Sequence, residues 1–197
     1  MAPLPFTQPE ARAAFDVVLG LFVLLELRVR LRSSHNPSGS SVDQGSVVWV
    51  VVFIVAGVAG GFALARRATG EAIPDVRWPL FALGLALMGA GIAIRQWAVV
   101  ALGRYFTVDV RVHPGQTVVD RGPYRWVRHP AYTGMIVTFV GIGVALGNWA
   151  ALVVLLVVPT VGLVVRIHYE ERALLDALGE PYRRFAASRP HLFPGLW

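Results

Sequence analysis

Long apolar runs alternate along the chain with short polar segments that are rich in arginine. A helix needs about 20 predominantly apolar residues to cross the hydrocarbon core of a bilayer. Five runs come near this length and predict five transmembrane helices, at residues 13–27, 47–65, 78–102, 132–146 and 149–165. Gly147 and Asn148 separate the last two runs, which predicts a tight turn and therefore a helical hairpin. The pattern thus predicts an all-α integral membrane protein with about five transmembrane helices.

The placement of arginine predicts how these helices are oriented. The chain has 18 basic residues, no Lys among them, and a formal net charge of +6. Segment 103–129 and the tail from residue 166 flank the predicted hairpin, so they share one side of the membrane, and both are rich in Arg. The positive-inside rule places that side in the cytoplasm, and an odd number of helices then places the N-terminus outside. The Lys-free composition is typical of a GC-rich bacterial genome, which predicts a bacterial inner membrane protein.

The composition also excludes several classes of protein. Charged residues make up 15% of the chain and hydrophobic residues 55%, whereas a soluble domain usually carries about 25% charged residues. This balance excludes a disordered protein and disfavours a soluble enzyme. The absence of Cys excludes disulfides and thiolate metal sites, and the five His residues show no metal-ligand spacing. The arginines flank apolar runs instead of forming a patch interleaved with aromatic residues, so no nucleic-acid partner is expected.

Polar residues that can carry chemistry gather in two segments, 116–134 and 166–182. The first borders the start of the predicted hairpin and the second follows its end. The hairpin therefore brings the two segments together on one side of the membrane, where we expect a single site.

The first segment contains Arg128-His129-Pro130-Ala131-Tyr132. Proline suits the first turn of a helix because its missing N–H needs no partner there. The amides of that turn form a positive helix end that can receive a carboxylate. Two interpretations stand side by side. His129 caps the helix and Tyr132 lies at the membrane interface, or His129 hydrogen-bonds a cofactor and Tyr132 lines its pocket.

In the second segment, Arg166 and Glu170 are four residues apart and share one face of a helix. They form either a simple ion pair between successive turns or part of a functional site, as ionisable groups at a membrane boundary often do. In the second case Glu170 binds a hydroxyl or amino group, and Arg166 holds an acidic substrate. Glu171 points about 100° away, toward solvent or toward Arg125 or Arg128.

Arg95 lies deep in the third apolar run, where an arginine is costly. Its side chain either extends toward the cytoplasmic end of the helix or points into the same cavity as the two polar segments. Glu26, in the first run, is expected near the cytoplasmic interface beside Arg28 and Arg30.

Two motifs stand in a fixed order: R-H-P-x-Y-x-G at 128–134 and, after the hairpin, E-E-x-x-L-x-x-x-x-G-x-x-Y at 170–182. Together with Gly122-Pro123-Tyr124 they make the chain, from residue 95 to its end, resemble the isoprenylcysteine carboxyl methyltransferase family. More broadly, the chain is similar to the membrane methyltransferases that include phospholipid N-methyltransferases. The resemblance implies two parts of one integrated domain: residues 1–102, with three helices and their loops, and residues 103–197, a cytoplasmic cofactor-binding region that includes the hairpin.

The resemblance implies an integral membrane carboxyl O-methyltransferase that uses S-adenosylmethionine. Its acceptor is lipophilic or lipid-modified, an isoprenylcysteine-type carboxylate, and enters from the surrounding membrane lipids. Arg166 and Glu170 are then the catalytic residues, and Arg166 and Arg95 bind the substrate. The cofactor contacts implied by the family fall on the following residues: Gln116, Thr117, Val118, Val119, Tyr124, His129, Pro130, Tyr132 and Glu170.

This chemistry needs positioning and exclusion of water more than a general base, because a carboxylate is already a nucleophile at neutral pH. A thiol or a phospholipid amine remains an alternative acceptor, with Glu170 or His129 as the base. A membrane reductase of the sterol type, which binds NADPH, has a similar R-H-P-x-Y pattern but is longer. A non-catalytic membrane protein or transporter would distribute its polar residues across several spans, whereas here they gather on one side.

Overall fold

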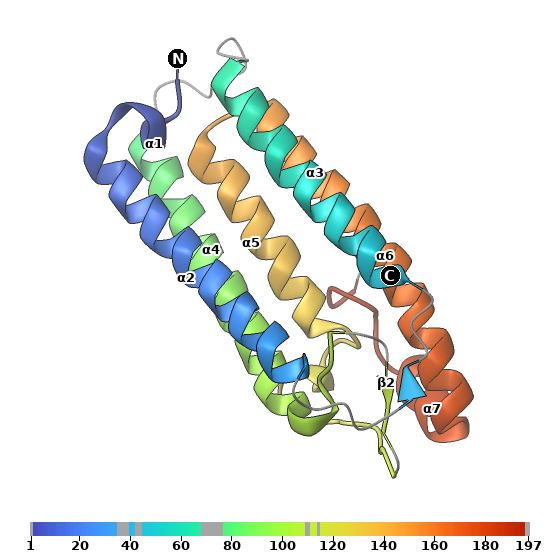
Figure 1. Cartoon of the computed structure of the whole chain (residues 1–197). Helices are drawn as coiled ribbons and strands as arrows, with labels where there is room; N and C mark the ends of the chain where they lie inside the picture. Colours follow the sequence, from blue (N-terminus) through green and yellow to red (C-terminus); the bar gives the residue numbers. More distant parts are fainter. Residues whose placement is uncertain are drawn as a thin grey trace.

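Five long helices lie side by side and alternate in direction in the computed structural model (Figure 1). The structure describes residues 2–34, 40–41, 45–67, 77–108, 111–113 and 115–195. The long helices are α2 (Pro9–Ser34), α3 (Ser46–Arg67), α4 (Arg77–Leu102), α5 (Pro130–Leu146) and α6 (Trp149–Leu178). The predicted all-α architecture is thus confirmed for the described part of the chain.

Shorter elements close the two ends of the bundle. Helix α1 (Leu4–Thr7) precedes α2, and α7 (Glu180–Ala187) follows α6. Two 3₁₀ turns, η2 (Gly103–Tyr105) and η3 (Gly122–Arg125), lie between α4 and α5. Strands β1 (Ser40–Ser41) and β2 (Arg111–Val112) pair antiparallel, which joins the segment after α2 to the segment after α4.

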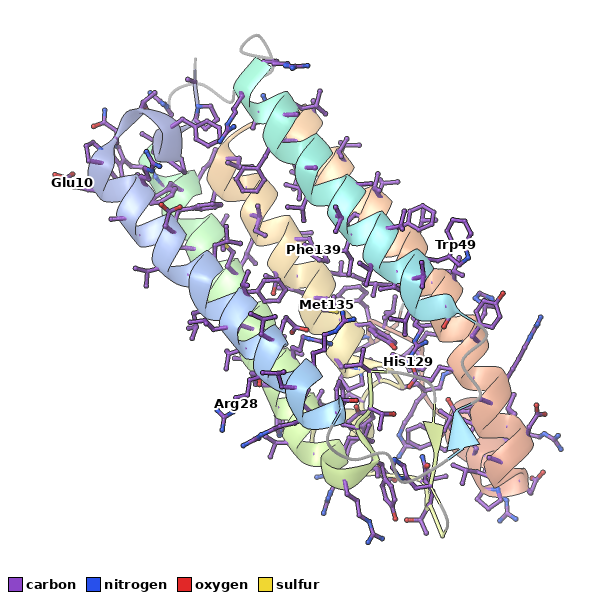
Figure 2. The ribbon with its side chains drawn as sticks, viewed as in Figure 1. Glu10, Arg28, Trp49, His129, Met135 and Phe139 are labelled. Carbon is purple, nitrogen blue, oxygen red and sulfur yellow. The ribbon has the colours of Figure 1, made fainter. Side chains whose placement is uncertain are left out.

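Three helices meet the length and composition required to cross a membrane: Ser46–Arg67, Arg77–Tyr105 and Trp149–Leu178. Helix α5 is apolar but has only 17 residues, or about 25 Å at 1.5 Å per residue. Helix α2 extends beyond the predicted run at both ends because nothing in the arginine-rich stretch after Leu27 stops a helix. Exposed apolar side chains such as Trp49 on α3, 56% exposed, project outward and suit contact with lipid (Figure 2).

Glycine lets α4 and α5 pack closely. A Cβ on Gly134 would lie 2.6 Å from the carbonyl oxygen of Gly91, and a Cβ on Gly91 would lie 2.4 Å from Oγ1 of Thr138. Real side chains do not fit at these distances, so both positions require glycine. This close contact carries the N-terminal end of α5 against α4 beside Arg95, which helps to position the site.

The hairpin between α5 and α6 forms as the sequence predicts. Gly147 ends α5 in the left-handed conformation, with φ of 58°, which glycine adopts without steric cost. Asn148 caps α6 because its side-chain oxygen accepts a hydrogen bond of 2.9 Å from the amide of Ala151. Helix α6 then runs on to Leu178, well past the predicted limit of residue 165, and Gly179 ends it. The second polar segment is therefore largely a continuation of the membrane helix.

Candidate active site

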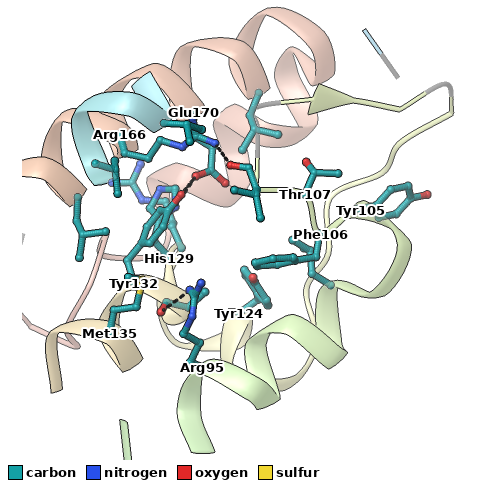
Figure 3. A pocket seen from close by; sticks show the side chains of 18 of the residues that line it. Arg95, Tyr105, Phe106, Thr107, Tyr124, His129, Tyr132, Met135, Arg166 and Glu170 are labelled. Atoms are coloured by element: carbon teal, nitrogen blue, oxygen red, sulfur yellow. Dashed lines mark hydrogen bonds and ion pairs between the residues drawn. The ribbon is translucent and has the colours of Figure 1, made fainter. Parts of the chain in front are cut away.

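A cavity of about 410 Å³ opens at the end of the bundle where α5 begins and α6 ends. Its wall on α6 consists of residues spaced three and four apart, which share one helix face. Its wall on α5 follows the same rule, with Tyr132, Met135 and Phe139. Figure 3 shows residues of α4, α5, α6 and the loop before η3 converging on this space. Helices α2 and α3 complete the wall on the membrane side.

Charged and hydroxyl-bearing side chains form a polar band across the middle of the cavity. We define the polar band as the following five lining residues: Glu26, Arg95, Tyr132, Arg166 and Glu170. They come from α2, α4, α5 and α6, so the band joins four helices.

Apolar lobes lie on both sides of the polar band. The membrane lobe, deeper in the bundle, is lined by Phe22, Val50, Ile54, Met135, Phe139 and Leu163. The inner lobe, toward α7, is lined by Val118, Val119, Tyr124, Leu174, Leu178 and Tyr182. Burial raises the pKa of the Tyr124 and Tyr182 phenols, so both remain neutral at physiological pH. Along α6, for example, the lining runs from Leu163 through Arg166 and Glu170 to Leu174 and Leu178, so charged residues stand between two mostly apolar groups in one cavity.

The polar band joins the two motifs directly. The hydroxyl of Tyr132 on α5 donates a 2.7 Å hydrogen bond to Oε2 of Glu170 on α6. Nδ1 of His129 lies 4.0 Å from the same oxygen, and its ring stacks on Tyr132 with centroids 5.8 Å apart. The predicted meeting of the two segments is therefore confirmed.

Arg166 is buried, with 4% of its surface exposed. Its guanidinium donates from Nη1 to Oγ of Ser46 at the start of α3, and from Nη2 to the carbonyl of Val108. These contacts fix the guanidinium at the cavity wall, one helical turn from Glu170. Arg166 therefore connects α6 to two segments that lie far away in the sequence.

Glu171 faces away from the cavity and holds the C-terminal strap, which we define as residues 188–195. Its Oε1 lies 2.7 Å from Nη1 of Arg128 and 3.0 Å from Nε2 of His129, and its Oε2 lies 3.2 Å from Nε2 of His191. This confirms Arg128 as its partner. Backbone bonds complete the attachment, since the amides of Arg128 and His129 donate to the carbonyls of Pro190 and His191.

The start of α5 differs from the first interpretation of the sequence, in which His129 caps the helix. His129 occupies the N-cap position, but its ring makes no capping hydrogen bond and pairs with Glu171 instead. The carbonyl of His129 already accepts from the amides of Tyr132 and Thr133, so these two amides are not available to an anion. Pro130 is fully buried and is absent from the cavity wall that the described residues form, so its predicted contact with a cofactor is not supported.

The other predicted site residues all line the cavity: Arg95, Gln116, Thr117, Val118, Val119, Tyr124, His129, Tyr132, Arg166 and Glu170. The open question about Arg95 is thereby settled, because its guanidinium points into the cavity and lies 6.0 Å from the Phe106 ring centroid. For Glu26, the structure shows a partner that the sequence did not indicate. Its carboxylate points into the cavity and pairs with Arg95, because packing brings this face of α2 against the part of α4 that carries Arg95.

Sequence reasoning missed three residues that hold the site together. Ser46 is buried against Arg166, the Thr133 hydroxyl donates a 2.6 Å bond to the carbonyl of Leu192, and His191 contacts Glu171. Of the three, only His191 could have been suspected from the sequence, because it is a histidine in the tail after the second motif. The other two depend on which helices become neighbours.

Comparison with known proteins shows which family the chain resembles. The sequence profile of the isoprenylcysteine carboxyl methyltransferase (ICMT) family matches residues 82–176. A probable protein-S-isoprenylcysteine O-methyltransferase of Oryza sativa subsp. indica is 33% identical over 134 residues, which cover 66% of this chain and 70% of the relative. The protein-S-isoprenylcysteine O-methyltransferase of Schizosaccharomyces pombe is 24% identical over 195 residues, which cover 91% of this chain and 82% of the relative.

The fold has a solved counterpart as well. The structure of the eukaryotic intramembrane Ras methyltransferase ICMT superposes with a TM-score of 0.66 at 18% identity and covers 98% of this chain and 70% of that one. This likeness places the chain in a class of membrane-embedded helical folds. Within this class, the chain belongs to the isoprenylcysteine carboxyl methyltransferase family.

Proposed function

We propose that this protein is an integral membrane methyltransferase that transfers the methyl group of S-adenosylmethionine to the carboxylate of an isoprenylcysteine-type acceptor. The observation that carries the proposal is the single cavity in which a polar band separates two apolar lobes. Methyl transfer between a nucleoside-bearing donor and a lipid-bearing acceptor needs two apolar compartments that meet at polar groups.

The inner lobe suits the methyl donor. Val118, Val119 and Leu174 form an apolar slot for the adenine, and Tyr124 and Tyr182 supply buried aromatic walls. Cofactor sites generally combine such apolar linings with a few placed polar groups. Here Glu170, held by Tyr132, is a carboxylate available to a ribose hydroxyl or to the ammonium group of the donor, and Gln116 and Thr117 add side-chain hydrogen-bonding groups.

The membrane lobe suits the lipid part of the acceptor. Phe22 on α2 and Phe139 on α5 make an edge-to-face contact, with centroids 6.2 Å apart, at its inner wall. Val23 on α2 and Val51 on α3 also line it and are 47% and 40% exposed, so the lobe opens sideways between these helices. An isoprenoid chain can enter here directly from the bilayer, while Arg95 and Arg166 draw its carboxylate to the polar band.

The reaction itself asks little of the protein beyond placement. S-adenosylmethionine supplies an activated methyl group when bound, and the acceptor carboxylate attacks it without losing a proton. The residues of the polar band therefore orient the carboxylate, and the buried lobes exclude water. Arg166 and Glu170 serve as the catalytic pair in this scheme, one toward the acceptor and one toward the donor.

The arrangement of the helices and the placement of arginine support a proposed membrane orientation. The antiparallel bundle carries the cavity, α7 and the strap at the end opposite α1 (Figure 1). The arginines of this end favour the cytoplasm, with the N-terminus outside, and the Lys-free composition favours a bacterial inner membrane. In this arrangement all five long helices cross the bilayer, including the short α5, which its neighbours shield.

The proposal is tested with purified full-length protein in detergent and methyl-labelled S-adenosylmethionine. The acceptors are an N-acetylated S-prenylcysteine, its carboxamide, a prenyl thiol and phosphatidylethanolamine. We expect label only with the free carboxylate, in a product from which mild base releases methanol. Label in the thiol or the amine would identify a different acceptor class, and no label with any acceptor would refute methyl transfer to the compounds tested.

A further inference from the structure

The pairing between Glu26 on α2 and Arg95 on α4 places a second carboxylate inside the polar band. Nε and Nη2 of Arg95 donate to the two oxygens of Glu26, and the Nη2–Oε2 distance is 2.7 Å. Side chains of both residues are largely buried, with 8% of Arg95 and 26% of Glu26 exposed. Both line the cavity, so the pair is part of its inner wall and not a contact at the surface of the bundle.

The geometry leaves part of the guanidinium available. Among the described residues, Glu26 accepts from two N–H groups of Arg95, and the carbonyl of Ala131 accepts from Nη1 of Arg95 at 3.3 Å. Arginine has five N–H donors, so one remains on each terminal nitrogen. Two donors on neighbouring nitrogens form a fork that matches a carboxylate. Arg95 can therefore hold an acceptor carboxylate while Glu26 keeps its place.

The chemistry of the proposed reaction makes the charge of this pair important. A lone pair of the carboxylate oxygen forms the new O–CH₃ bond while the S–CH₃ bond electrons return to sulfur. An anion and a cation become a neutral ester and a neutral thioether, and no proton moves. A cation beside the carboxylate is therefore attracted more strongly in the ground state than in the transition state, which slows the step.

We infer that Glu26 is a positioning residue that neutralises the charge of Arg95. Arg95 then orients the acceptor carboxylate but binds it less tightly than an unpaired guanidinium would. This inference rests on the proposed function and adds a specificity element on α2, outside both motifs. Arg95 then orients the acceptor through its two N–H donors, and Glu26 reduces the electrostatic stabilisation of the unreacted carboxylate.

The test compares the native protein with Glu26→Gln, which keeps a side-chain oxygen for Nε of Arg95 but removes the negative charge. Binding of the N-acetylated S-prenylcysteine and of its carboxamide is measured on protein saturated with S-adenosylhomocysteine, so that no turnover occurs. We expect Glu26→Gln to bind the carboxylate about tenfold more tightly, or about 1.4 kcal/mol, and the carboxamide within about twofold of the native value. With S-adenosylmethionine, we expect kcat for the carboxylate to fall about tenfold.

Two further variants separate charge from structure. The double variant Glu26→Gln with Arg95→Gln has no net charge and no fork, so the tighter binding of the carboxylate should disappear. Asp16→Asn is the matched control on α2, because Asp16 is 60% exposed in a surface pair with Arg12 and lies outside the cavity wall. It should leave both affinities and kcat unchanged.

A purely structural role for Glu26 predicts the opposite change in affinity for the carboxylate. If Glu26 only fastens α2 to α4, its loss weakens carboxylate and carboxamide together, and that result overturns the inference. Tighter carboxylate binding that survives in the double variant also overturns it. Failure of the proposed function is distinct, since the native protein would then neither methylate the prenylcysteine nor prefer it to its carboxamide.

Discussion

Tyr132 and Glu170 are 38 positions apart in the sequence, yet the phenol of one donates a 2.7 Å hydrogen bond to the carboxylate of the other. The bond crosses from α5 to α6 within the polar band of the cavity. It fixes the carboxylate at the point where a donor and an acceptor would meet. The two sequence motifs therefore contribute to one cavity.

Glu170→Gln should weaken binding of S-adenosylhomocysteine by roughly 10- to 100-fold, since a hydrogen bond to a charged group contributes about 1.5–3 kcal/mol. Tyr132→Phe should have a smaller effect, because the carboxylate keeps its charge and loses only its orienting partner. Isothermal titration measures both. Glu180→Gln is the control, since Glu180 is 54% exposed on α7. Unchanged affinity in Glu170→Gln would remove Glu170 from the donor site.

Arg166→Lys should lower turnover of the carboxylate acceptor by at least tenfold while changing the affinity for S-adenosylhomocysteine less than threefold. Lysine keeps the charge but lacks the planar fork that reaches Ser46 and the Val108 carbonyl. Steady-state kinetics with both substrates varied provides the measurement. Arg184→Lys serves for comparison, because Arg184 is 77% exposed. If cofactor affinity falls as much as turnover does, Arg166 acts on the donor side.

Gly91→Ala should destabilise the bundle by about 1–3 kcal/mol, the usual cost of overpacking. Its Cβ would lie within 2.6 Å of the backbone of α5, which cannot move without disturbing the site. Gly89→Ala, two residues earlier on α4, meets nothing within 4 Å and should be neutral or slightly stabilising. Thermal unfolding in one detergent compares the two. Equal melting temperatures would show that α4 and α5 are not tightly packed there.

Acidification should loosen the C-terminal strap. Burial and the nearby Arg128 lower the pKa of His191 below 6.5, although Glu171 acts in the opposite direction. Nη2 of Arg128 lies 2.7 Å from Nδ1 and 2.8 Å from Nε2 of His191, and Nε2 lies 3.2 Å from Oε2 of Glu171. A neutral ring with its proton on Nε2 can accept from Arg128 at Nδ1 and donate to Glu171. Because the folded form binds the proton less readily than the unfolded form, the contribution of His191 to stability is complete above pH 6.5 and declines as pH falls below it.

Hydrogen exchange of the strap amides at pH 7.5 and pH 5.5 measures this effect, after correction for the intrinsic pH dependence of exchange. We expect less protection at the lower pH in the native protein. His191→Gln should remove most of the difference between the two pH values, and a difference of native size in that variant would point to another group. His168→Gln is the control, since His168 is exposed on α6.

Several parts of the structure were predictable from local features. The apolar runs indicated the helices, Gly147 and Asn148 the hairpin turn, and the spacing of Arg166 and Glu170 their common face. Other parts were not. Helix ends differed most at α2 and α6, where charged residues continue a helix that hydropathy alone would end. The interpretation of His129 as a side-chain cap was wrong, because its ring pairs with Glu171.

Local features of the sequence specify which segments are helical and apolar, and which polar residues border the hairpin, because periodicity and turn chemistry act between near neighbours. The partners of the buried charges came from the three-dimensional packing: Glu26 pairs with Arg95, Ser46 and Val108 hold Arg166, and Glu171 anchors the strap. These contacts depend on which helix faces pack together. A buried charge pairs with a residue that packing brings close to it, and the local sequence around the charge does not indicate which residue this is.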